Sequence, residues 1–166
     1  MPIKDIIINE SNTIIKKLFS DNKNVLGVLV RGTDYISKKR RNHPIQPKVE
    51  IVIKDVKIMD KRNNYNYIFI TTEDDIIRNK FIKEFYKKIK FNKYKKNINY
   101  NYKSKKLLGY NKNIKGNIEY MKIYLINIII LSKCIDIITV RTSGTVGVFI
   151  ISNGFRNTKI YFLGNH

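Results

Sequence analysis

Several residue types that define whole classes of protein are rare or missing in this sequence of 166 residues. Its single cysteine, Cys134, excludes an internal disulfide, and no Cys/His cluster has the spacing of a metal site, so we expect no metal. The longest apolar stretch, residues 123–131, contains Asn127 and is far shorter than the roughly 20 residues that span a membrane. Because the N-terminus also lacks the basic-then-apolar pattern of a signal peptide, we expect a soluble, cytoplasmic chain.

Acidic residues are scarce as well, with 13 Asp and Glu against 33 Lys and Arg, which gives a net charge of +20. Such an excess favours polyanionic partners: nucleic acid, an anionic membrane surface or a phosphorylated ligand. The sequence also holds 31 Ile, 26 Lys and 20 Asn but no Ala and no Trp. Ile, Lys and Asn are the residues that an AT-rich genome favours, so codon usage can account for part of the charge.

Half of the excess charge lies in residues 80–106, which hold eleven Lys and one acid, Glu84. Tyrosines are interleaved with these lysines, and such a segment can form an electrostatic track for single-stranded nucleic acid. Alternatively, the first lysines of the segment lie on the exposed face of an amphipathic helix, where Lys is common. We keep a basic nucleic-acid-binding protein as the alternative hypothesis, and an anionic membrane surface as a further candidate partner.

Strand-like and helix-like patterns alternate along the chain. Apolar runs bounded by polar residues predict strands at 25–30, 67–71, 135–140 and 159–163. Apolar residues at helical spacing predict helices at 6–18, 48–60, 74–90, 116–132 and 145–152. We expect residues 91–115, rich in Lys and Asn, to be mostly loop. The alternation indicates an α/β fold: a single Rossmann-like, three-layer domain over residues 1–166, with a mainly parallel sheet and a leading helix within residues 1–24.

Polar loops follow three of these strands, and ligands of open α/β sheets bind at the carboxyl ends of the strands. After the first strand, Arg31 and Gly32 can offer a planar cation and nearby NH groups to a phosphate. The alternative is a surface Arg31 paired with Asp34. After the second strand, a carboxylate among residues 72–75 can accept hydrogen bonds from a nucleobase or sugar, or the segment can simply form a variant capping box from Thr72 to Asp75.

The loop after the strand at 135–140 opens the next helix. NH groups at a helix N-terminus have no partner within the helix and bind anions, and small residues allow close approach. This turn therefore suits a phosphate, although Ser143 or Thr145 could serve only as the helix cap.

Together these segments resemble a known family. The order VLGVLVRGTDY (25–35), HPIQP (43–47), YIFITTEDD (67–75) and SKCIDIITVRTSGTVGVFIISNG (132–154) is similar to bacterial polysaccharide-biosynthesis glycosyltransferases related to the GDP-fucose-dependent α1,2-, α1,6- and protein O-fucosyltransferases. The resemblance implies the C-terminal, donor-binding half of a GT-B enzyme. Such a domain holds a nucleotide sugar, GDP-fucose or a similar donor, without a metal or another cofactor. The sugar would pass to a glycan acceptor in surface polysaccharide synthesis, peripheral to the inner face of the plasma membrane.

The resemblance also assigns residues. Arg31, which would grip the diphosphate, and Asp34 are the implied catalytic residues, whereas Leu29 replaces the family's His. In the inverting transfer that this implies, Arg31 would stabilise the negative charge on the departing nucleoside diphosphate. The implied donor-binding residues are Gly32, Thr72, Glu73, Asp74, Arg141, Thr142, Ser143, Gly144 and Thr145.

A GT-B enzyme also needs an acceptor-binding domain, and only about 24 residues precede the first motif. We therefore expect either a separate chain that supplies the acceptor domain, or an inactive remnant that still binds nucleotide.

Overall fold

The computed structural model describes residues 3–20, 24–32, 41–92 and 118–166. Helices and strands alternate through these ranges: α1 (Ile3–Phe19), β1 (Val25–Leu29), α3 (Val49–Asn63), β2 (Tyr67–Thr71), α4 (Asp75–Phe85), β3 (Ile89–Lys90), α5 (Ile118–Ser132), β4 (Asp136–Val140), α6 (Ser143–Ile151) and β5 (Asn157–Tyr161). The expected loop at 91–115 lies almost wholly outside the described residues, as does Asp34.

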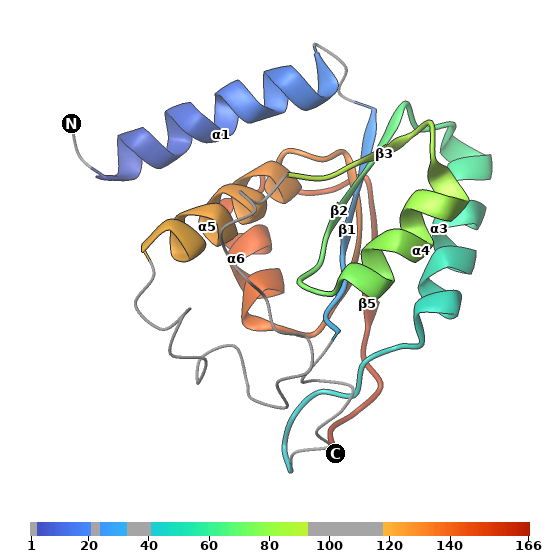
Figure 1. Cartoon of the computed structure of the whole chain (residues 1–166). Helices are drawn as coiled ribbons and strands as arrows, with labels where there is room; N and C mark the ends of the chain where they lie inside the picture. The colour runs from blue at the N-terminus through green and yellow to red at the C-terminus, as the bar shows by residue number, and fades with distance from the viewer. Residues whose placement is uncertain (1–2, 21–23, 33–40, 93–117) are drawn as a thin grey trace.

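The five strands form one sheet in the order β3-β2-β1-β4-β5, and every neighbouring pair is parallel. β1 is the central strand, with Leu26 opposite Ile68 on β2 and opposite Asp136 on β4. Helices α3 and α4 cover one face of the sheet, and α1, α5 and α6 cover the other (Figure 1). The α/β prediction is confirmed: the domain is Rossmann-like, with three layers and a parallel sheet.

The central strand is buried on both faces, which is why its sequence is a continuous apolar run. Alternate side chains point to opposite faces of a strand. Leu26, Val28 and Val30 therefore join the core beneath α3 and α4, whereas Val25 and Leu29 join the core beneath α1, α5 and α6. Each such aliphatic side chain stabilises the fold by roughly 1.5–3 kcal/mol when it is fully buried.

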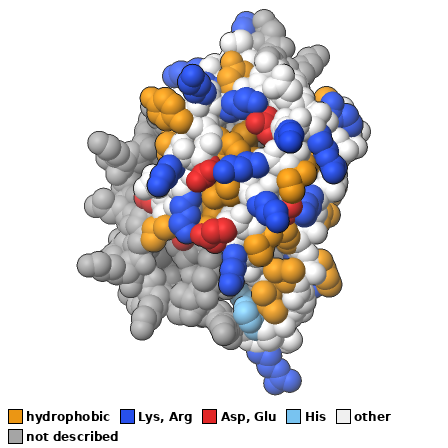
Figure 2. Space-filling view, turned by 90° about the vertical axis from the view of Figure 1, so that its right-hand side faces the viewer, with side chains coloured by type: hydrophobic (Ala, Val, Ile, Leu, Met, Phe, Trp, Pro, Cys, Tyr) orange, Lys and Arg blue, Asp and Glu red, His pale blue; other side chains and the backbone are white. Residues whose placement is uncertain are grey.

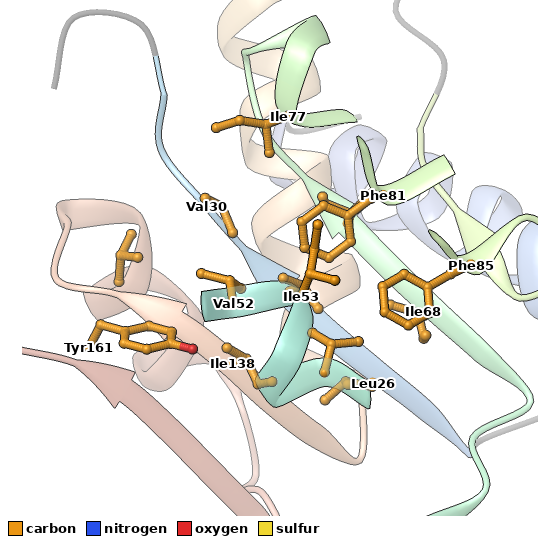
Figure 3. Close-up of a cluster of buried hydrophobic side chains, with 14 of the residues drawn as sticks. Leu26, Val30, Val52, Ile53, Ile68, Ile77, Phe81, Phe85, Ile138 and Tyr161 are labelled. Carbon is orange, nitrogen blue, oxygen red and sulfur yellow. The ribbon is translucent and has the colours of Figure 1, made fainter. Parts of the chain in front are cut away.

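The first of these cores shows how the helical spacing in the sequence is used (Figure 3). On α4, Ile77, Phe81 and Phe85 recur every four residues and all three are buried. Val52 and Ile53 of α3 reach the same cluster from the neighbouring helix. The polar faces of both helices are left toward solvent, as an amphipathic pattern predicts.

The predicted helix at 74–90 is wrong at its end. Helix α4 stops at Phe85, a turn follows in which the NH of Lys88 donates to the carbonyl of Phe85 at 2.8 Å, and Ile89 begins β3. Ile89 keeps the four-residue spacing of the helix because it packs on the same core from the edge of the sheet, opposite Ile68. Apolar spacing alone does not distinguish these two placements.

The helix caps lie at other residues than the alternatives that the sequence offered, Thr72 for α4 and Ser143 or Thr145 for α6. Asp74 caps α4, because its Oδ1 accepts hydrogen bonds from the NH groups of Ile76 at 2.8 Å and Ile77 at 3.3 Å. At α6 the cap is Thr142, whose Oγ1 accepts from the NH of Thr145 at 3.3 Å. Each cap is the last residue with extended backbone before the first helical turn, which is where an N-cap must lie.

A buried carboxylate lies at the amino end of β4. Asp136 is fully buried and accepts hydrogen bonds from the Tyr65 hydroxyl, from Arg156 Nη2 at 2.5 Å and Nε at 3.2 Å, and from the backbone NH of Asn157 at 2.8 Å. Burial alone would raise the pKa of this carboxyl, but the hydrogen bonds from Arg156 and its other donors outweigh it and lower the pKa below the ordinary value. The carboxylate ties β4 to β5 and to the segment before β2.

None of the helices in the described part of the chain is both long and apolar enough to cross a membrane.

Candidate functional site

The strand order brings the three predicted loops together. The sheet runs outward from β1 in two directions, through β2 and β3 on one side and through β4 and β5 on the other. Loops on either side of such a reversal leave a crevice at the carboxyl edge of the sheet. Here the crevice is a hollow of about 270 Å³, lined by Leu29, Arg31, Thr71, Thr72, Glu73, Tyr120, Tyr124, Thr142, Ser143 and Gly144.

The loop after β1 is held by the loop after β2. Oε1 of Glu73 accepts a hydrogen bond from the NH of Gly32 at 3.0 Å and lies 3.3 Å from Nε of Arg31. Both side chains are shielded, with 7% of Glu73 and 18% of Arg31 exposed. Gly32 lies so close to Asp74 that a Cβ on it would fall 2.5 Å from the Asp74 side chain. The two loops are therefore packed directly on each other.

The second loop is fixed in turn by the start of α4. The NH of Asp74 donates to Oγ1 of Thr72 at 3.2 Å, and Nη2 of Arg78 donates to the carbonyl of Thr72 at 3.2 Å. One oxygen of the Asp74 carboxylate, Oδ1, caps α4. Thr72 and Glu73 line the hollow, whereas Asp74 does not, so the structure places Asp74 behind the site as a support.

The third loop brings the N-terminus of α6 to the hollow. The NH groups of the first helical turn, including those of Ser143 and Gly144, have no partner within the helix. Beneath them, the Thr145 hydroxyl lies 2.7 Å from the Thr139 hydroxyl and also donates to the carbonyl of Val140. Thr145 is therefore an anchor between α6 and β4, and it does not line the hollow.

Arg141 is also outside the hollow. Its guanidinium lies 4.8 Å from the ring centre of Phe162, and its Nη1 donates to Oδ1 of Asn165 at 3.3 Å. The side chain borders a separate, shallow depression between α6 and β5 instead. The structure thus brings together Arg31, Thr72, Glu73, Thr142, Ser143 and Gly144, with Gly32 just behind them.

The sequence reasoning missed two tyrosines. Tyr120 and Tyr124 lie one turn apart on α5 and complete the wall of the hollow. A Cβ on Gly144 would fall 2.7 Å from the Tyr124 hydroxyl, so this glycine allows the two helices to approach closely. A signal existed in the sequence: a helix that leads into a parallel strand runs antiparallel to it, so its first turns lie at the carboxyl edge of the sheet.

The site does not contain a cluster of metal ligands. Within the described ranges, no group of three or more His, Cys, Asp or Glu side chains is placed to hold a metal ion. The hollow offers one guanidinium, one carboxylate already engaged with it, hydroxyl groups and helix NH groups. Such a lining suits a polar ligand that carries negative charge.

The same fold occurs in solved structures of a fucosyltransferase. POFUT1 in complex with GDP matches with a TM-score of 0.55 at 8% sequence identity, over 93% of this chain and 47% of that one. POFUT1 in complex with GDP-fucose matches with TM-scores of 0.55 and 0.53 in two crystal forms, at 8% and 7% identity. This chain has a fucosyltransferase-like fold. It spans about half the length of those chains. No family model and no curated protein matches its sequence.

Several of the lysines that the structure describes form ion pairs with acidic side chains. On the face that α3 and α4 make, a few Asp and Glu side chains lie among the more numerous Lys and Arg side chains (Figure 2). Lys80 pairs with Glu50 at 2.6 Å, and Lys88 pairs with Asp60 at 2.9 Å. The lysines from 93 onward in the basic segment lie outside the described residues. The nucleic-acid hypothesis therefore stays a prediction.

Proposed function

We propose that the chain binds a nucleotide sugar, GDP-fucose or a similar donor, in the hollow at the end of β1, as the donor-binding part of a glycosyltransferase. One observation carries this proposal. Three loops that are far apart in the sequence place a shielded arginine, hydroxyl groups and a helix N-terminus around one hollow, in a fold shared with a protein crystallised with GDP and with GDP-fucose.

The diphosphate is the part of the donor that this hollow suits best. Its volume of about 270 Å³ lies just below the range of roughly 300–1,000 Å³ of pockets that enclose drug-sized ligands, so we propose that the nucleoside extends beyond it. Arg31 supplies a cation, and the NH groups of Ser143 and Gly144 lie at the positive end of the α6 dipole. The Tyr120 and Tyr124 side chains of α5 complete the lining of the hollow.

The chemistry we propose is inverting sugar transfer to a glycan hydroxyl. The acceptor oxygen attacks the anomeric carbon and gives up its proton to a base or to water, the bond from that carbon to the diphosphate breaks, and the electron pair leaves with the diphosphate. Arg31 and the α6 NH groups would stabilise the negative charge that grows on the diphosphate. Stabilisation of such a charge by fixed donors is usually the largest single contribution to catalysis. Asp34 stays the predicted acidic residue of the site. A role in surface polysaccharide synthesis, with a partner chain binding the acceptor, is part of the same proposal.

Calorimetric titration with GDP, GDP-fucose and UDP-sugars tests the binding step. We expect Arg31→Ala to weaken GDP binding by about 10- to 100-fold, the loss of one charge-assisted contact. Arg62→Ala is the matched control, because Arg62 is an exposed arginine on α3, away from the hollow. A folded wild-type protein that binds none of these nucleotides would overturn the proposal.

Release of GDP from GDP-fucose in the presence of glycan acceptors tests the transfer step separately. Binding without transfer to any acceptor or to water is expected both of an inactive donor-binding remnant and of a donor-binding half that lacks its partner chain, the two alternatives that the sequence left open.

A further inference from the structure

We infer that Glu73 is a positioning residue, which acts on the ligand through Arg31 and does not itself recognise the nucleobase or the sugar. This inference rests on the proposed binding of a nucleoside diphosphate in the hollow. It replaces the sequence-based expectation that Glu73 contacts the donor.

The geometry of the Glu73 carboxylate supports this role. A single oxygen, Oε1, meets two consecutive residues of the neighbouring loop: the backbone NH of Gly32 at 3.0 Å and Nε of Arg31 at 3.3 Å. The first contact fixes where the loop turns, and the second fixes the direction of the guanidinium. A long arginine side chain loses much rotamer freedom on binding a ligand, so holding it in advance favours affinity.

Glu73 can hold its neighbour because its own backbone is held. The residue before it, Thr72, bonds to the NH of Asp74, and Asp74 caps α4 and packs against Gly32. The carboxylate therefore projects from a turn that is fixed to the first turn of α4. With 7% of its side chain exposed, Glu73 is also well shielded from water, which strengthens its attraction for Arg31.

The two roles predict different effects on ligand choice. A residue that contacts a nucleobase changes the preference for guanine over uracil when it is removed. Removal of a residue that positions Arg31 weakens the binding of every ligand with a diphosphate by the same factor. This includes inorganic pyrophosphate, which has no base or sugar. In a protein that lacks the Arg31 side chain, its removal has no further effect.

A double-mutant cycle on the full chain measures this coupling. The affinities of GDP, UDP and inorganic pyrophosphate are determined for wild type, Glu73→Ala, Arg31→Ala and the double variant. We expect Glu73→Ala to weaken the binding of all three ligands roughly tenfold, because the shielded ion pair that holds Arg31 is lost. In the Arg31→Ala background the same change is expected to alter affinity less than about twofold.

Two further variants complete the test. Glu84→Ala removes a carboxylate on α4 that pairs with Lys57, far from the hollow, and is expected to leave all three affinities unchanged. Glu73→Gln keeps an oxygen that can accept from Gly32 and Arg31, so it is expected to lose less affinity than Glu73→Ala. If Glu73→Ala does not fold, the cycle is run with Glu73→Gln.

The outcomes separate the two levels of the argument. Wild-type protein that binds none of the three ligands contradicts the proposed function itself. Wild-type binding together with an undiminished effect of Glu73 in the Arg31→Ala background, or with a changed ratio of GDP to UDP affinity, overturns the positioning role alone. Equal loss for the three ligands, abolished when Arg31 is absent, supports it.

Discussion

Replacing Asp136 with asparagine tests how strongly the buried carboxylate at the amino end of β4 stabilises the fold. The two oxygens of Asp136 face donors only: two nitrogens of Arg156, the backbone NH and side-chain amide of Asn157, and the Tyr65 hydroxyl. Asparagine has the same shape but replaces one acceptor with a donor. If its oxygen stays with Asn157, its NH₂ group faces Arg156 and Tyr65.

The expected magnitude follows from which contacts survive. The Tyr65 hydroxyl can rotate to accept from the new NH₂ group, so its hydrogen bond is retained. Arg156 loses its charge-assisted bond of 2.5 Å and cannot accept a hydrogen bond in exchange. A hydrogen bond to a charged group is worth about 1.5–3 kcal/mol, and breaking a fully buried ion pair costs about 3–5 kcal/mol. Because 46% of the Arg156 side chain is exposed and can regain water, we expect Asp136→Asn to cost about 2–3 kcal/mol.

Urea unfolding at neutral and at acid pH measures this loss. The pKa of Asp136 is lowered in the folded state, so its contribution is present above the ordinary Asp pKa of about 4 and is lost as the pH falls through the lowered value. The difference between wild type and Asp136→Asn should therefore shrink in acid. Glu50→Gln, in an exposed pair with Lys80, is the control and should leave the midpoint unchanged. Equal stability at neutral pH, or a difference that does not change with pH, would refute the reasoning.

Two other predictions concern stability. Gly32→Ala places a Cβ 2.5 Å from the Asp74 side chain and should destabilise the protein by roughly 1–3 kcal/mol in urea unfolding. The control Gly147→Ala, whose Cβ would have its nearest contact at 3.5 Å, should be neutral or stabilising. Equal losses of stability for the two variants would contradict the close approach of the loops after β1 and β2. Burial and hydrogen bonds to carboxylates raise the pKa of Tyr65 and Tyr161, so stability should fall as the pH rises above the ordinary tyrosine pKa of about 10. Phenolate absorbance during an alkaline titration should show these two tyrosines ionising only as the protein unfolds, and ionisation of all tyrosines in the folded state would disprove it.

The sequence was sufficient to predict the features of the fold that depend on a single strand or helix. Continuous apolar runs identified β1 and β2, and their polar ends identified the loops of the site, because burial on both faces leaves polar residues only where a strand emerges. It was insufficient where two placements satisfy the same pattern. An apolar residue at position 89 fits a helix that continues as well as a strand that pairs with β2. The neighbouring sequence does not distinguish these two placements.

The roles of the polar residues were harder to predict for a related reason. Glu73, Asp74 and Thr145 are all polar residues at strand ends, where ligand contacts are expected. Whether such a side chain faces a ligand or a neighbouring loop depends on contacts across the sheet, for example between Glu73 and Gly32. Those contacts join residues about 40 positions apart, and no local pattern in a single sequence records them.

The central position of β1 in the sheet determines how its backbone takes part in local and global unfolding. Strands at the edges of a sheet exchange their amide hydrogens through local fluctuations, whereas a strand bonded on both sides and packed into both cores is exposed only when most of the molecule unfolds. Arg31 follows β1 after a single residue, so its backbone is attached to the part of the domain that opens least often. Partial unfolding at β3 or β5 would then leave Arg31 in place at the proposed diphosphate site, and we expect its position to be lost only in global unfolding.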